Sequence, residues 1–231
     1  VGEPDFKPPE EVKTALAEVY DKGYGKYGPA KGITELRNEL TKVVGRAFAG
    51  IENIMICPGA RFGVYLAITT LLNPGDEIIV IEPAWPAYKD CALNAGIKVR
   101  TIKTTLETKW EPSVEQINNT INENTKMIVL NYPNNPTGKI LPRKLLDSIV
   151  QTAKEHDLYI LSDEIYEYYY TDGDLKAPDI WTEYGYEKTI VTKSFSKSYA
   201  MTGYRIGWVI AEPSIIEKMS KLQALSLTNV S

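Results

Sequence analysis

The sequence contains few of the residues that build disulfide frameworks or histidine-rich metal sites. Among its 231 residues there are two cysteines and one histidine. The cysteines, Cys57 and Cys91, lie far apart and lack the short spacing that is typical of metal ligands. These shortages argue against a disulfide scaffold and a metal centre, so we expect a reduced, cytoplasmic protein with no bound metal.

The sequence also lacks an excess of positive charge and any long apolar run. Its 26 lysines and arginines are outnumbered by 30 aspartates and glutamates, which gives a net charge of −4. Runs such as "EIIVI" and "KMIVL" are far shorter than the roughly 20 residues that span a bilayer. We therefore expect neither a nucleic acid nor a membrane as a partner.

Short β-branched runs alternate with amphipathic stretches along the chain, 43% of which is hydrophobic. Strands are predicted over residues 53–59, 77–83, 97–103, 126–133, 158–164, 188–195 and 204–211. Helices are predicted over residues 8–23, 33–48, 60–72, 85–96, 113–124, 143–157 and 214–226. Ser113 and Gln116 have the spacing of a capping box. The alternation predicts an α/β fold with a mainly parallel, seven-stranded mixed sheet, helices on both faces and an N-terminal helical segment.

Chemically distinctive residues follow the predicted strands, at the edge where such sheets bind ligands. The segments at five strand ends read "PGAR", "EPAW", "NYPNNPTG", "SDEIY" and "SFSK". Lys197 supplies an amine, Arg205 a planar cation that suits a phosphate, and Ser194 a hydroxyl. The backbone from Gly59 to Arg61 lies where a strand gives way to a helix, and free amides at a helix start bind phosphate.

Three more strand-end residues, Asp163, Asn135 and Trp85, add an acid, an amide and an aromatic plate. The whole set suits a phosphorylated aromatic cation attached to a lysine, and pyridoxal 5′-phosphate (PLP) fits that description. We therefore predict one composite site for this cofactor. A plain nucleotide-binding domain is disfavoured, because no G-x-G-x-x-G follows the first strand.

Five segments in register resemble the class I/II aminotransferases, which are fold-type-I PLP enzymes of the aspartate and aromatic aminotransferase kind. In chain order they are "VGEPDF", "KYGPAKGITELR", "NYPNNPTG", "SDEIY" and "SFSKSYAMTGYRIGW". The resemblance covers essentially the whole chain. It implies a homodimeric enzyme of amino acid metabolism and biosynthesis, which transfers an amino group from an amino acid to a 2-oxo acid.

The resemblance also assigns catalytic roles. Lys197 matches the lysine that forms the internal aldimine and later moves a proton between the substrate Cα and the cofactor. Asp163 matches the carboxylate that keeps the pyridine nitrogen protonated. Tyr166 and Asn135 match the pair that hydrogen-bonds the 3′ oxygen of the cofactor and lowers the pKa of the imine. The peptide bond between Asn135 and Pro136 is expected to be cis.

Other matched positions are implied to bind the phosphate, the ring or the substrate. The implied phosphate cradle consists of the backbone of Gly59, Ala60 and Arg61 and the side chains of Ser194 and Arg205. The role of the Arg61 side chain stays open. Trp85 matches the aromatic residue that stacks on the pyridine ring, and Tyr27 matches a tyrosine that reaches the phosphate of the neighbouring subunit. The implied substrate contacts are Gly2, Trp85 and Asn135.

Residues 1–49 are expected to form an N-terminal segment and residues 50–231 the PLP-binding large domain. The family clamps the substrate α-carboxylate with a second arginine from a C-terminal small domain, which we expect to be absent from this chain. Other PLP chemistry stays open, as a C–S β-lyase, a cyclopropane-forming synthase or a decarboxylase, and so does a PLP-binding regulator domain. The particular amino acid and oxo acid are not indicated.

Overall fold

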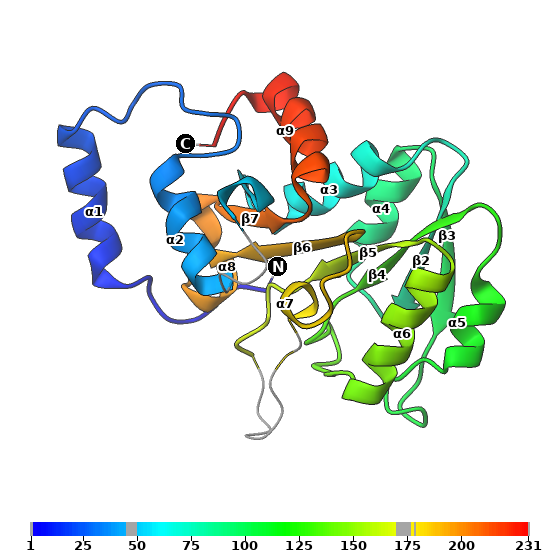
Figure 1. Ribbon diagram of the computed structural model, residues 1–231. Helices are drawn as coiled ribbons and strands as arrows, with labels where there is room; N and C mark the ends of the chain where they lie inside the picture. The colour runs from blue at the N-terminus through cyan, green and yellow to red at the C-terminus, as the bar shows by residue number, and fades with distance from the viewer. Residues whose placement is uncertain (1, 45–49, 170–176, 178, 231) are drawn as a thin grey trace.

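The computed structural model describes residues 2–44, 50–169, 177 and 179–230. At its centre lies a seven-stranded sheet with the strand order β1-β7-β6-β5-β4-β2-β3 (Figure 1). The strands are β1 (Ile54–Cys57), β2 (Glu77–Glu82), β3 (Lys98–Lys103), β4 (Thr125–Leu130), β5 (Tyr159–Asp163), β6 (Thr189–Ser194) and β7 (Gly207–Ile210). Strands β2 to β6 pair in parallel, and β7 runs antiparallel to both β1 and β6. The predicted mixed, mainly parallel sheet is confirmed.

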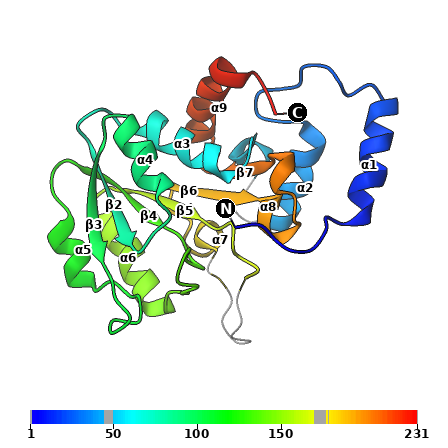
Figure 2. The same ribbon diagram turned by 180° about the vertical axis from the view of Figure 1, so that it is seen from behind.

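Helices cover both faces of this sheet (Figures 1 and 2). They are α1 (Glu10–Asp21), α2 (Thr34–Val44), α3 (Ala60–Leu71), α4 (Ala87–Asn94), α5 (Val114–Thr120), α6 (Arg143–Glu155), α7 (Ile180–Tyr184), α8 (Phe195–Ser198) and α9 (Pro213–Leu227). Helices α3, α4 and α9 pack on one face, and α2, α5, α6 and α7 pack on the other. The predicted capping box is present, because Ser113 Oγ accepts a hydrogen bond from the Gln116 amide at 3.0 Å and Gln116 Oε1 accepts one from the Ser113 amide at 2.8 Å.

The side chains of each central strand alternate between two apolar layers. From β4, Met127 and Val129 join the layer under α3 and α4, whereas Ile128 and Leu130 join the layer under α5 and α6. A strand that is buried on both faces reads as a continuous apolar run, which explains why this strand was predictable. The same alternation decides which residues near the carboxyl end of a strand face the site.

Two short helices, α7 and α8, were not predicted. The predicted strand over residues 188–195 ends at Ser194, and α8 begins directly after it. The Ser194 hydroxyl accepts a hydrogen bond from the Ser196 amide at 3.0 Å and so caps this four-residue helix. The predicted helix over residues 33–48 is α2 as far as Val44, and residues 45–48 lie outside the described residues.

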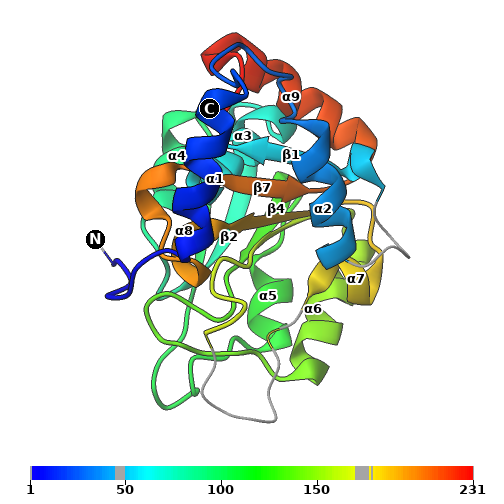
Figure 3. The ribbon, with the colours of Figure 1, turned by 90° about the vertical axis from the view of Figure 1, so that its left-hand side faces the viewer.

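The N-terminal segment carries α1 and α2, which face the viewer in Figure 3. Helix α2 packs on β1, whereas none of the side chains of α1, all within the described part of the chain, is buried. Apolar side chains of α1 are exposed, including Leu16 at 49% and Tyr20 at 86%. Within the described ranges, no helix has the length and apolar character needed to cross a membrane.

Candidate active site

A cleft of about 430 Å³ opens at the carboxyl ends of β5 and β6 and brings most of the predicted site residues together. Parallel strands end at the same edge of a sheet, so residues distant in sequence meet there. The predicted residues that line the cleft are Gly2, Ala60, Arg61, Trp85, Asp163, Ser194, Lys197 and Arg205. They come from the N-terminal segment, the start of α3, the loop before α4, the ends of β5 and β6, helix α8 and the segment before β7.

Lys197 lies in α8 and directs its amine into this cleft. Its Nζ donates a hydrogen bond to the Gly2 carbonyl and lies 6.0 Å from the centre of the Tyr166 ring. Partial burial lowers the pKa of Lys197, although Glu3 opposes this shift. A lowered pKa raises the fraction of neutral amine, which is the nucleophilic form. Tyr169, which the sequence did not single out, donates a hydrogen bond to the Lys197 carbonyl at 2.9 Å.

Asp163 is a buried acid at the end of β5, with 1% of its surface exposed. Its Oδ2 accepts a hydrogen bond from the Tyr88 hydroxyl at 2.7 Å, and its Oδ1 accepts one from Thr192 Oγ1 at 3.0 Å. Burial raises the pKa of Asp163 to about 6, and these hydrogen bonds oppose the rise. A buried carboxylate without a cation is unfavourable, so the site favours a positive group on the open, cleft side of Asp163.

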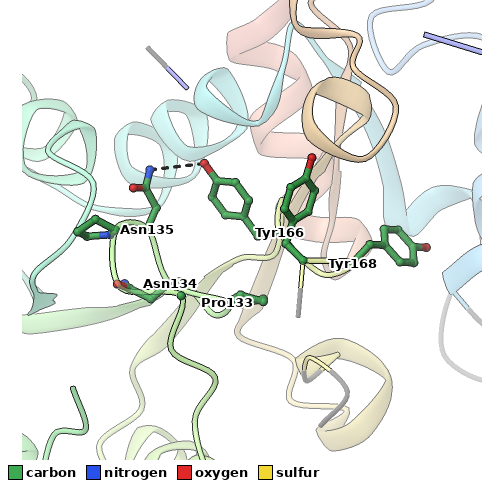
Figure 4. Close-up of a pocket in the computed structure, with 8 residues that line it drawn as sticks. Pro133, Asn134, Asn135, Tyr166 and Tyr168 are labelled. Atoms are coloured by element: carbon green, nitrogen blue, oxygen red, sulfur yellow. Dashed lines mark hydrogen bonds between the residues drawn. The ribbon is translucent and has the colours of Figure 1, made fainter. Parts of the chain in front are cut away.

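Asn135 and Tyr166 meet at the edge of a second cavity, of about 560 Å³ (Figure 4). Asn135 Nδ2 donates a hydrogen bond to the Tyr166 hydroxyl at 3.5 Å. The Asn135–Pro136 bond is cis, as predicted. Asn131, which the sequence analysis did not select, accepts a hydrogen bond from the Asn135 amide at 2.9 Å and donates one to the Asp163 carbonyl at 2.9 Å. It therefore ties the loop of Asn135 to the strand end of Asp163.

The start of α3 forms an anion cradle with Arg205. Gly59 precedes the helix at φ 86°, and a Cβ built on it would lie 2.5 Å from Arg205 Nη2. The guanidinium of Arg205 donates hydrogen bonds to the carbonyls of Thr202 at 2.8 Å and Pro58 at 3.2 Å, which hold it beside the helix start. Free amides at a helix start together with a planar cation suit a phosphate. The Ser194 hydroxyl borders the same cleft and donates to the Ile206 carbonyl at 3.0 Å.

The side chain of Arg61, whose role the sequence left open, stacks on Trp85. Its guanidinium carbon lies 4.7 Å from the centre of the Trp85 ring, over the face of the indole. Trp85 in turn packs edge-on against Tyr88, with ring centres 5.4 Å apart and planes at 87°. The aromatic plate predicted for the cofactor ring is therefore held between Arg61 and the tyrosine that hydrogen-bonds Asp163.

Tyr27, another predicted site residue, lines neither of these two cavities. Its side chain is 89% exposed and belongs to the segment between α1 and α2. The residues that the sequence analysis missed, Tyr88, Thr192, Asn131 and Tyr169, act through hydrogen bonds to other site residues. Position carried a weak signal for two of them: Tyr88 follows Trp85 by three residues, and Thr192 shares a strand face with Ser194.

These residues fit PLP: a half-buried lysine amine, a buried carboxylate and an anion cradle line one cleft of an α/β fold. The model of the family described as Aminotransferase class I and II matches residues 1–230. The chain belongs to this family, whose cofactor is PLP.

Similar proteins include two archaeal relatives. The aspartate aminotransferase of Pyrococcus horikoshii is 40% identical over 234 residues, covering 100% of this chain and 59% of its own length. The aromatic-amino-acid aminotransferase 2 of Thermococcus litoralis is 35% identical, over 99% of this chain and 60% of its own length. A solved double mutant of Thermus thermophilus aspartate aminotransferase has a TM-score of 0.95 at 34% identity, over 100% of this chain and 60% of that one. The chain thus spans about three fifths of the length of these relatives.

Proposed function

We propose that this chain is the cofactor-binding part of a PLP-dependent aminotransferase that moves an amino group from an amino acid to a 2-oxo acid. One observation carries the proposal: Lys197, Asp163 and Arg205 converge on a single cleft from three different segments. An amine, a buried acid and an anion-binding cation are the groups that this cofactor requires. The relatives named above are all aminotransferases, which favours transamination over lyase or synthase chemistry on the same scaffold.

Each group has a task that follows from its chemistry. Arg205 and the first amides of α3 hold the phosphate, and the face of Trp85 orients the ring. Asp163 would keep a proton on the ring nitrogen, because its carboxylate is buried and lines the cleft, where a cation stabilises its charge. The Tyr166 hydroxyl and the Asn135 amide are the proposed hydrogen-bond donors to the 3′ oxygen, and their mutual contact at 3.5 Å supports a shared role.

When bound, PLP supplies an electron sink for negative charge at the substrate Cα. Lys197 is the base that removes the Cα proton and returns it, because its amine reaches into the cleft and its pKa is lowered by burial. Gly2 lies beside this amine, where the absence of a side chain leaves room for substrate. Trp85 and Asn135 complete the proposed substrate contacts. The names of the relatives favour aspartate or an aromatic amino acid as the donor.

We also propose that the enzyme is a cytoplasmic homodimer, in which residues 1–49 form the segment that meets the second copy and residues 50–231 form the PLP-binding domain. Both cysteines are free, which suits a reducing compartment.

The apolar side chains exposed on α1 support an interface between two copies of the chain. A cavity of about 420 Å³ beside the cradle, lined by Pro58, Arg61, Phe62, Tyr65, Cys91 and Arg205, is the proposed seat of Tyr27 from the second copy.

The proposed function is tested by titrating the purified chain with PLP and following the absorbance of the cofactor. The wild-type chain is expected to develop the visible band of a lysine-bound cofactor, and Lys197→Ala to lack it. Arg205→Met should bind PLP about 10- to 100-fold more weakly, because one charge-assisted phosphate contact is lost. A wild-type chain that leaves the PLP spectrum unchanged at saturating concentration refutes the proposal.

A further inference from the structure

A buried charge cluster lies directly behind the cleft, on the other face of the sheet. It consists of Lys193 on β6 and three carboxylates, with Nζ to oxygen distances of 3.4 Å to Glu164, 2.6 Å to Glu167 and 3.8 Å to Asp179. Lys193 is 3% exposed and Glu164 is 1% exposed. None of these four residues is among those that line the cleft.

The charges in this cluster interact strongly, because one ammonium contacts three carboxylates. Burial acts to lower the pKa of Lys193, but the surrounding carboxylates outweigh it and raise that pKa, so the ammonium stays charged. Burial raises the pKa of Glu164 to about 7. Glu164 Oε1 accepts hydrogen bonds from Ser162 at 2.9 Å and from the Ile180 amide at 3.2 Å, whereas Oε2 faces Lys193. Removing one partner from such a set leaves a buried charge uncompensated.

The cluster and the cleft share two strand ends. Side chains alternate along a strand, so Asp163, Thr192 and Ser194 point to the cleft face while Glu164 and Lys193 point to the opposite face. The Glu164 amide also donates a hydrogen bond to the Thr192 carbonyl at 2.9 Å. A shift of Lys193 relative to Glu164 would therefore move the groups on the cleft side as well.

The turn that carries Tyr166 is held at both ends by Lys193. Glu164 and Glu167 flank Tyr166, both contact the Lys193 ammonium, and the Glu167 amide closes the turn onto the Glu164 carbonyl at 3.1 Å. This arrangement fixes the backbone from which the Tyr166 ring reaches toward Asn135 (Figure 4). Cofactor sites need such supporting contacts, because small displacements of a binding group weaken its interaction strongly.

We propose that Lys193, acting through Glu164 and Glu167, is a positioning residue that holds the Tyr166 hydroxyl against the cofactor's 3′ oxygen. The proposal rests on the proposed function, because it takes the cleft to be the PLP site. Tyr166 donates to the deprotonated 3′ oxygen and thereby lowers the pH at which the bound cofactor titrates. Loosening the turn should raise that midpoint, in the same direction as removing the hydroxyl by Tyr166→Phe.

The test compares variants by PLP titration and by the pH dependence of the bound cofactor's absorbance. Lys193→Met should weaken PLP binding about tenfold or more and raise the titration midpoint. Lys193→Arg, which keeps the charge, should restore most of both. Lys188→Met is the matched control, because Lys188 precedes the same strand but pairs with Asp157 at 2.6 Å, away from the cleft. It should leave both properties unchanged.

Glu167→Gln decides the matter if Lys193→Met does not fold. The side chain of Glu167 is 21% exposed and that of Glu164 only 1%, so the neutral isostere of Glu167 should fold and still raise the midpoint. An unchanged midpoint and affinity in the folded variants overturns the proposal, and so does a loss of thermal stability without any change in the midpoint. If the wild-type chain itself fails to bind PLP, the proposed function fails and this inference fails with it.

Discussion

At the scale of single residues, the site combines an amine, a buried acid and an anion-binding cation with other side chains that hold these groups in place. Asp163 ends β5, Lys197 follows the end of β6 and Arg205 precedes β7. Motif and position together pointed to these three residues, and all three line one cleft. Tyr88 holds Asp163 from 75 residues away, through a hydrogen bond that no local pattern encodes. Such partners are set by tertiary packing, which explains why the sequence did not predict them.

The buried carboxyl of Asp163 predicts a specific dependence of stability on pH in the cofactor-free chain. Its folded-state pKa is about 6, above the ordinary value of 3.8, so its contribution to stability is complete below pH 3.8 and is lost as the pH rises through about 6. Between pH 5 and pH 8 this loss amounts to about 1 kcal/mol. Asp163→Asn, which does not titrate, should remove it.

Urea denaturation at these two pH values measures the effect. Glu164 also has a raised pKa but is present in both proteins, so the difference between wild type and Asp163→Asn isolates Asp163. Saturating PLP should reverse the trend in the wild type, because a cation beside Asp163 favours the carboxylate. An identical pH slope in both cofactor-free proteins would contradict the assignment of a raised pKa to this residue.

At the scale of secondary structure elements, the strands were predictable because each is a compact apolar run bounded by turn residues. The sequence missed α8 because its four residues continue a strand-like stretch, and the change of direction depends on the Ser194 hydroxyl. It missed α7 because five residues are too few to show a helical period. The sequence predicted the start of α3, but the close approach of the Arg205 guanidinium to Gly59 is visible only in the structure.

The junction of β1 and α3 yields a prediction about Gly59. At φ 86°, with a built Cβ only 2.5 Å from Arg205 Nη2, Gly59→Ala combines backbone strain with displacement of the guanidinium. We expect a loss of about 1–3 kcal/mol in unfolding free energy and weaker PLP binding. Denaturation and PLP titration measure the two effects.

Gly75→Ala is the control for this change. Gly75 has φ 99°, and no described atom lies within 4 Å of a Cβ built there, so its substitution introduces strain alone. It should reduce stability without altering PLP affinity. If both alanine variants bind PLP as tightly as the wild type, Gly59 does not shape the anion cradle.

At the scale of the whole molecule, the fold class was fully predictable, but the contacts beyond one chain were suggested by family resemblance alone. The exposed Tyr27 and the apolar side chains of α1 give that suggestion a physical basis, because isolated chains rarely leave such a group uncovered. A single sequence cannot show which exposed residues a second copy covers. The exposed side chains of α1 and of Tyr27 mark the surface that a second copy would cover.

The proposed homodimer predicts that a charge on α1 separates the two copies. Tyr20 is 86% exposed, and Tyr20→Glu should weaken self-association at least about tenfold, because aromatic residues carry much of the binding energy of interfaces. Sedimentation velocity over a range of concentrations measures this. Leu106→Glu is the control, since Leu106 is 70% exposed but lies in the loop between β3 and α5. Equal behaviour of both variants argues against α1 as the interface.

Covalent attachment of PLP to Lys197 in this cleft is the chemistry on which the proposed function depends. The direct measurement is borohydride reduction of the PLP-treated chain, followed by proteolysis and mass spectrometry of the peptides. Stoichiometric addition of the reduced cofactor to Lys197 is the predicted result, with no labelled peptide from Lys197→Ala. Labelling spread over other lysines, or no labelling of the wild-type chain at all, would exclude Lys197 as the specific attachment site of PLP.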